Sequence, residues 1–181
     1  MIKKIAVIGP ESTGKSFLCE QLATHYKSNW APEYAREYLL THGTHYAYED
    51  LYNMAIGQIN KEDNALQQLK SACQNNEVDI PLFIDTDLYV IKVWSEFVFN
   101  KCDNRILKMI AARHYDMYLL CNIDLPWVAD ELREYPDLET REKLFHYYKD
   151  CLVQQNVPWQ IISGDYKERI SDAIASVSAI L

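Results

Sequence analysis

The chain has 181 residues, 49% of them apolar, and a formal net charge of −8 from 26 acidic and 18 basic side chains. This length predicts one domain with a full hydrophobic core, and the negative charge excludes broad nucleic-acid binding because it repels a phosphate backbone. No apolar run approaches the roughly 20 residues that cross a bilayer, and the five cysteines include no C-x-x-C pair, so we expect reduced thiols, no membrane partner and a cytoplasmic location.

The first expected element is a buried strand from Lys3 to Ile8, and the motif G-x-x-x-x-G-K-S follows it at residues 9–16. The backbone of such a loop wraps a phosphate, Lys15 reaches the β- and γ-phosphates, and the Ser16 hydroxyl binds Mg²⁺. Apolar residues at helical spacing from Phe17 to Tyr26 place a helix N-terminus directly after the loop. The motif therefore predicts a nucleoside-triphosphate site. The loop residues expected at the ATP phosphates are Gly9, Glu11, Ser12, Thr13, Gly14, Lys15, Ser16 and Phe17.

A short second strand is predicted from Asn29 to Pro32, and a helix is predicted to begin at Glu33. Small-molecule kinases built from alternating strands and helices often carry, after this strand, the carboxylate that faces the acceptor hydroxyl. Glu33 is therefore a candidate base, and Arg36 could steady its charge or a phosphate. The alternative is an exposed first turn, where acidic residues favour a helix N-terminus.

A long amphipathic helix is predicted from Glu49 to about Gln74, because apolar residues from Leu51 to Cys73 recur at helical spacing. We interpret this stripe as core. The charged outer face of the helix is expected at Lys61, Glu62 and Asp63.

The third strand, predicted from Pro81 to Ile84, ends in Asp85-Thr86-Asp87. Apolar residues that end in an aspartate have the form of a Walker B strand, whose aspartate holds Mg²⁺. Asp85 is therefore the expected metal ligand, and its alternative role is to cap the helix that begins near Leu88. Asp87 is expected either to bind a substrate hydroxyl or to cap that helix.

A fourth strand is predicted from Met117 to Cys121, and the region near 125–141 after it is expected to form a lid. An arginine on such a segment closes over the γ-phosphate, excludes water and neutralises developing charge. Arg133 and Arg141 are the candidates for this role at the ATP phosphates. The alternative for each is a solvated arginine at the surface.

A fifth strand is predicted from Gln160 to Ile162, and a closing helix from Tyr166 to Leu181. Strands that alternate with helices along the whole chain predict an α/β fold, with a five-stranded parallel sheet and helices on both faces. Right-handed crossovers place the carboxyl ends of all these strands at one edge of the sheet. We therefore expect the separate motifs to meet there.

Five segments stand out together: Gly9-Pro10-Glu11-Ser12-Thr13-Gly14-Lys15-Ser16, Glu33-Tyr34-x-Arg36-Glu37, Met54-Ala55-x-Gly57-Gln58, Phe83-Ile84-Asp85-Thr86-Asp87 and Trp127-Val128-x-Asp130-x-Leu132-Arg133. In order and spacing the chain resembles, over nearly its whole length, the ribosylnicotinamide kinase domain of the bifunctional nicotinamide-nucleotide adenylyltransferase/ribosylnicotinamide kinase family. The second and fourth segments make this resemblance more specific than the P-loop alone.

The resemblance implies a kinase-type P-loop fold with strand order 2-3-1-4-5, which we expect as a single domain over residues 1–181. It also implies a reaction: ATP, with Mg²⁺, phosphorylates the 5′-hydroxyl of a small-molecule nucleoside acceptor, nicotinamide riboside, to give nicotinamide mononucleotide. In the family a tryptophan directly precedes the Glu-Tyr-x-Arg-Glu segment. Pro32 holds that position here, so Trp30 is expected to contact the nicotinamide ring.

The expected roles follow from the motifs and the resemblance together. The catalytic candidates are Lys15, Glu33, Asp85 and Arg133, the metal ligands are Ser16 and Asp85, and the substrate contacts are Trp30, Glu33, Tyr34, Arg36 and Asp87. The sequence leaves open which of Glu33, Asp85 and Asp87 is the base. It also leaves open a kinase for another nucleoside, and a P-loop NTPase that acts as a regulatory switch.

Overall fold

The computed structural model describes residues 1–72 and 79–181. Its strands form a parallel sheet in the order β2-β3-β1-β4-β5, which confirms the expected fold class and strand order. The strands are β1 (Ile2–Ile8), β2 (Asn29–Ala31), β3 (Ile80–Asp85), β4 (Met117–Cys121) and β5 (Trp159–Ile162).

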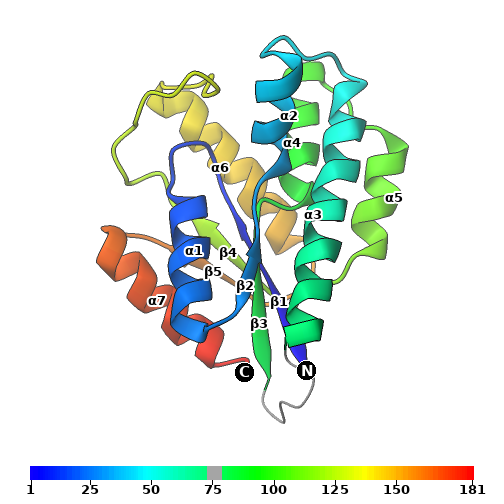
Figure 1. Ribbon diagram of the computed structural model, residues 1–181. Coiled ribbons are helices and arrows are strands. Elements are labelled where there is room, and N and C mark those ends of the chain that lie inside the picture. The colour runs from blue at the N-terminus through cyan, green and yellow to red at the C-terminus, as the bar shows by residue number, and fades with distance from the viewer. Residues whose placement is uncertain (73–78) are drawn as a thin grey trace.

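The helices in the described part of the chain are α1 (Lys15–Tyr26), α2 (Tyr34–His42), α3 (Asp50–Ala72), α4 (Leu88–Phe99), α5 (Asn104–Ala112), α6 (Leu138–Val153) and α7 (Tyr166–Ser178). Helices α1 and α7 cover one face of the sheet, and α3, α4 and α6 cover the other (Figure 1). A third apolar cluster joins α2, α3, α4 and α5 beyond the sheet. Over the described residues, no helix combines the length and the apolar character that crossing a membrane requires.

Strand β1 shows why the sheet holds helices on both faces. Ala6 and Ile8 belong to the apolar cluster with α3, α4 and α6, whereas Ile5 and Val7 belong to the cluster with α1 and α7. Successive side chains of a strand point to opposite faces, and all four of these are fully buried. A strand covered on both sides needs an uninterrupted apolar run, which is what the sequence has here.

Helices α5 and α6 were not assigned from the sequence. Each follows an aspartate whose side chain accepts a backbone N–H of the first turn: Asp103 from Arg105 at 2.7 Å, and Asp137 from Thr140 at 2.8 Å. An aspartate at the N-cap satisfies one of the donors that a helix start leaves unpaired. These two aspartates are the signal that locates both helices.

The prediction that Glu62 lies on the charged outer face of α3 was wrong. Glu62 is 1% exposed, and its carboxylate accepts hydrogen bonds from the Tyr115 hydroxyl at 2.9 Å and from Arg113 Nη2 at 3.0 Å. A buried carboxylate is tolerated only when it is paired. Its partners come from the C-terminal end of α5 and the segment after it, which lie beside α3, and helical periodicity alone carries no information about that neighbour.

The expected long helix is confirmed as far as Ala72. Cys73 and the expected helix end near Gln74 lie outside the described residues. Of the other cysteines, Cys19 and Cys121 are buried. Cys102 and Cys151 are half-buried.

Candidate functional site

Three of the loops that leave the carboxyl ends of the parallel strands at one edge of the sheet are residues 9–14 after β1, 86–87 after β3 and 122–137 after β4. Figure 1 shows this edge at the end of the molecule away from both chain termini. Direct bonds join the first and third loops, since Ser12 Oγ accepts the backbone N–H of Val128 at 2.9 Å. The P-loop and the segment with Trp127 and Arg133 therefore meet at this edge, as expected.

The P-loop has the backbone that its glycines allow. Gly9 has φ of +142°, and a Cβ there would lie 2.7 Å from the carbonyl oxygen of Cys121. Gly14 has φ of +77°, which also favours glycine. The Thr13 hydroxyl and the Lys15 ammonium both donate to the carbonyl of Pro10, at 2.8 and 2.9 Å. Helix α1 begins at Lys15, so its N-terminal dipole faces the loop and suits an anion.

Asp85 ends β3 beside this loop. It is 1% exposed, and its Oδ1 atom has no hydrogen-bond partner among the described residues. Burial, followed by the negative charge of Glu33, raises the pKa of Asp85 to about 7, whereas Lys15 and the Ser16 hydroxyl lower it. A buried, unpartnered carboxylate oxygen that lies near both P-loop side chains fits a Mg²⁺ ligand.

The wider surroundings of Asp85 also suit Mg²⁺. Within residues 1–72 and 79–181, no group of three or more histidine, cysteine, aspartate or glutamate side chains gathers to hold a metal. Mg²⁺ does not need such a cage, because it usually keeps several waters and binds through one or two carboxylates and the substrate phosphates.

The capping role considered for Asp85 belongs to Asp87. Its Oδ1 accepts the backbone N–H of Tyr89 at 2.9 Å, at the start of α4, and its Oδ2 accepts the Tyr118 hydroxyl at 3.1 Å. Burial and the negative charge of Glu62 raise the pKa of Asp87 to about 7. Both oxygens are used within the protein, so contact between Asp87 and a substrate stays a prediction.

The segment after β2 carries the other expected carboxylate. Glu33 stands at the N-cap of α2, and its side chain makes no capping hydrogen bond. Arg36, on the first turns of α2, donates two hydrogen bonds to Asp130, at 3.1 and 2.8 Å. This pair, with a further contribution from Glu33, raises the pKa of Arg36. Arg36 was expected to steady Glu33 or a phosphate, and in the structure its direct partner is the carboxylate of Asp130.

Residues 122–137, which we call the lid segment, contain no helix or strand and lie against the P-loop. The Glu11 carboxylate accepts the backbone N–H groups of Glu134 and Tyr135, at 3.0 and 3.3 Å. Burial raises the pKa of Glu11. The side chain of Glu11 therefore holds the lid segment, which leaves the loop backbone as the part of this residue available to a phosphate.

The two candidate arginines lie at this junction in different environments. Arg133 donates to Ser12 Oγ at 3.3 Å and to the carbonyl of Val128. Arg141 lies in the first turn of α6, is only 5% exposed, and has two guanidinium nitrogens without a partner among the described residues. Its guanidinium lies 5.4 Å from the centre of the Trp127 ring. Burial lowers the pKa of Arg141, so an anion at this position would relieve an unpaired buried charge.

Trp30 lies on the face of the sheet that α1 and α7 cover. Its side chain packs against the apolar cluster under α1 and α7, next to its β3 neighbour Phe83. Ala31, which follows it, belongs to the cluster on the opposite face. The expected contact between Trp30 and the acceptor ring stays a prediction.

Sequence reasoning missed Arg169 of α7. It is 2% exposed and donates to three backbone carbonyls: Thr13 at 3.1 Å, Gly164 at 2.8 Å and Asn122 at 2.9 Å. It also pairs with the carboxylate of Asp124. Arg169 therefore ties the P-loop to the loops after β4 and β5. No local pattern marks it, since a single arginine in a helix is usually solvated.

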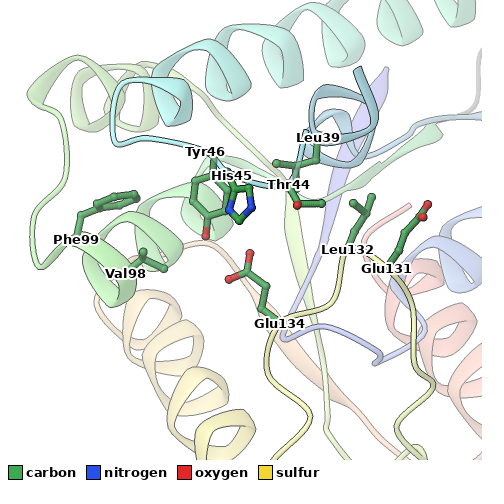
Figure 2. A pocket seen from close by; sticks show the side chains of 9 residues that line it. All are labelled: Leu39, Thr44, His45, Tyr46, Val98, Phe99, Glu131, Leu132 and Glu134. Atoms are coloured by element: carbon green, nitrogen blue, oxygen red, sulfur yellow. The ribbon is translucent and has the colours of Figure 1, made fainter. Parts of the chain in front are cut away.

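A cavity of about 460 Å³ lies between the end of α2, the loop after it, the end of α4 and the lid segment (Figure 2). Figure 2 shows the carboxylate of Glu134 pointing toward the hydroxyl of Tyr46. The Tyr46 hydroxyl accepts a hydrogen bond from the indole N–H of Trp94 at 2.5 Å. The lining residues are Leu39, Thr44, His45, Tyr46, Val98, Phe99, Glu131, Leu132 and Glu134. The cavity thus combines aromatic rings with two carboxylates. None of its lining residues was a candidate for a catalytic or binding role, although Glu131, Leu132 and Glu134 lie in the expected lid at 125–141.

The sequence pattern of a family described as an AAA domain matches residues 4–169 of the chain. The chain is also 25% identical, over 185 aligned positions, to the trifunctional NAD biosynthesis/regulator protein NadR of Salmonella typhimurium, and equally to NadR of Escherichia coli. The alignment covers 99% of this chain and 43% of each relative, so the chain spans less than half the length of these curated relatives.

Solved structures show the same fold. A NadR protein in complex with NR superposes with a TM-score of 0.76 at 24% identity, covering 98% of this chain and 49% of that one. A thymidylate kinase from Ehrlichia chaffeensis superposes with a TM-score of 0.68 at 10% identity, covering 97% of this chain and 98% of that one. These likenesses confirm the kinase-type P-loop fold.

Proposed function

The chain belongs to a family of AAA domains, and on that premise we propose that it is an ATP-dependent small-molecule kinase. The observation that supports this most is the surroundings of Asp85, where a buried carboxylate oxygen, without a partner in the described part of the chain, lies near Lys15 and Ser16 of the P-loop. Phosphoryl transfer requires a phosphate cradle, a carboxylate for Mg²⁺, a base near the acceptor hydroxyl and mobile cations. The edge of the sheet has a candidate for each.

In this proposal the backbone of residues 9–14 and the Lys15 ammonium hold the β- and γ-phosphates. Ser16 and Asp85 would hold Mg²⁺, which supplies neutralisation of the charge on the phosphate oxygens. The kinase domain is proposed to span residues 1–181, with a lid at residues 125–141, which comprise most of the lid segment and the first turn of α6. The residues proposed at the ATP phosphates are Gly9, Glu11, Ser12, Thr13, Gly14, Lys15, Ser16, Phe17, Arg133 and Arg141.

The remaining roles are the base for the acceptor hydroxyl, the cations near the transferred phosphoryl group and the exclusion of water. Glu33, whose carboxylate makes no capping bond, accepts the proton of the acceptor hydroxyl. Arg133 and Arg141 offset the charge that develops on the transferred group, and the lid segment excludes water. Asp85 is assigned to the metal and Asp87 to the cap of α4, which leaves Glu33 as the base.

We propose nicotinamide riboside as the acceptor, phosphorylated at its 5′-hydroxyl. Similarity to NadR, one structure of which holds NR, supports this choice. The cavity beside the lid segment supports it independently, because its rings at Tyr46 and Phe99 and its carboxylates at Glu131 and Glu134 suit a flat ring with a fixed positive charge. A contact between the positively charged ring and one aromatic face is worth roughly 0.5 to 2 kcal/mol.

The test is ADP release from ATP and Mg²⁺ with no acceptor, with nicotinamide riboside, and with uridine or cytidine. The proposal expects turnover that depends on an acceptor and is fastest with nicotinamide riboside. Equal turnover with another nucleoside would support the kinase proposal and contradict nicotinamide riboside as the preferred acceptor. Turnover that no acceptor stimulates would favour a regulatory NTPase. Lys15→Ala is the control against contaminating kinases, since loss of this charge lowers kcat/KM by about 10² to 10⁴.

Two variants, Phe99→Ala and Trp30→Ala, test where the ring of the acceptor binds. If the ring lies in the cavity, Phe99→Ala raises the KM for nicotinamide riboside more than the KM for ATP. If it lies at Trp30, then Trp30→Ala has that effect and Phe99→Ala does not.

A further inference from the structure

Helix α2 begins without help from its own cap residue. The first backbone N–H groups of a helix have no partner inside it, and a side chain at the N-cap usually accepts one of them. Glu33 occupies that position, but its side chain makes no such bond. The N–H of Tyr34, the first residue of α2, donates instead to Oε1 of Gln58 at 2.8 Å.

Gln58 uses the other half of its amide on a second segment of the site. Its Nε2 donates to the backbone carbonyl of Asp85 at 3.3 Å. Gln58 lies in the middle of α3 and is 1% exposed, so water does not compete for these bonds. One buried amide therefore joins the start of α2 to the end of β3.

The neighbouring residue of α3 strengthens the same junction. The ring of Tyr34 lies directly on Gly57, where a Cβ would be 1.9 Å from Cε1 of the ring. Tyr34 is thus held twice, through its backbone by Gln58 and through its ring by the space that Gly57 leaves. Glu33 directly precedes Tyr34, so its position follows from both contacts.

We propose that Gln58 is a positioning residue, which fixes the start of α2, and with it Glu33, against Asp85. The proposal rests on the proposed kinase function for its catalytic consequence. A neutral amide meets both requirements, since it offers one acceptor to Tyr34 and one donor to Asp85. A leucine of similar size provides neither, and an ionised glutamate provides only the acceptor.

The first experiment measures the bonds without reference to activity. Hydrogen exchange at the Tyr34 amide is compared in Gln58→Leu, Gln58→Glu and the control Gln67→Leu, which makes the same change at an exposed position of α3. We expect exchange at least tenfold faster in Gln58→Leu than in the control, and near-control protection in Gln58→Glu, which keeps the acceptor. Equal protection in Gln58→Leu and the control would overturn the proposal.

The second experiment measures kinase activity in the same variants. We expect kcat to fall at least tenfold in both Gln58 variants, with the KM for ATP within threefold of the control, because the P-loop is untouched. A kcat within twofold of the control in Gln58→Glu or in folded Gln58→Leu would overturn the positioning role. If the wild-type protein phosphorylates no acceptor, the kinase proposal fails, and exchange at Tyr34 still decides whether Gln58 anchors α2.

Discussion

Arg36 and Asp130 form an ion pair with two hydrogen bonds, of 3.1 and 2.8 Å, that joins helix α2 to the lid segment. The Arg36 side chain is 46% exposed, and exposed pairs of this kind contribute only about 0.2 to 1 kcal/mol. Its importance lies in what it connects, since α2 follows the proposed base and the lid segment carries Arg133.

The pair predicts a coupling between these two residues. We expect Arg36→Gln and Asp130→Asn each to lower kcat/KM about twofold to fivefold, and the double variant to be no worse than either single one. High salt, about 0.5 M, should remove most of the difference because it screens an exposed pair. Losses that multiply in the double variant would contradict a shared role.

The raised pKa of Asp85 predicts how stability changes with pH. In the folded protein this carboxyl titrates near pH 7, against an ordinary value of 3.8, so between these two values the folded state binds the extra proton. The free energy of unfolding therefore falls as the pH rises from about 4 to about 7.

Asp85→Asn should remove that part of the pH dependence. Without Mg²⁺ or nucleotide, we expect the variant to be more stable than wild type at pH 8 and to lose this advantage at pH 4. Thermal unfolding at both pH values measures it, with the exposed Asp172→Asn as the control. An unchanged pH dependence in Asp85→Asn would show that the carboxyl is not neutral in the folded protein.

The contact between Gly57 and Tyr34 predicts a steric effect. Gly57→Ala places a methyl group in the Tyr34 ring, and overpacking of this kind costs about 1 to 3 kcal/mol. We expect urea unfolding to show that loss, together with a lower kcat. Adding Tyr34→Ala removes the clash, so the double variant should lose less stability than the sum of the two single variants. If the stability losses of the two single variants simply added in the double variant, the clash with the Tyr34 ring would not be the cause of the Gly57→Ala effect.

Two ion pairs of different burial predict different costs. Arg113→Ala leaves the buried Glu62 carboxylate without its cation, and we expect a loss of about 3 kcal/mol in urea unfolding. Arg105→Ala breaks a pair with Asp103 in which the arginine is 58% exposed, and should cost much less than Arg113→Ala, because solvent screens an exposed pair. Similar losses in the two variants would contradict the role assigned to burial.

Features that are continuous in the sequence were predicted well. The P-loop, the five strands and the aspartates at the end of β3 each depend on neighbouring residues: a glycine spacing, an apolar run, a polar residue at a strand end. The sheet edge could be inferred as well, because parallel strands with right-handed crossovers place their carboxyl ends together. The sequence did not decide whether Asp85 or Asp87 caps α4, because a local pattern does not distinguish two aspartates two positions apart. In the structure the cap is Asp87.

The sequence by itself determined the phosphate-binding loop, the α/β class and the edge where the motifs meet, because the backbone geometry of each follows from adjacent residues. Only the tertiary structure decided the partners of buried polar groups. Glu62 is buried because Arg113 and Tyr115 reach it, and Gln58 holds Tyr34 and Asp85 because three elements pack together. A buried polar group must be paired, but its partner is fixed by packing between segments far apart in the chain.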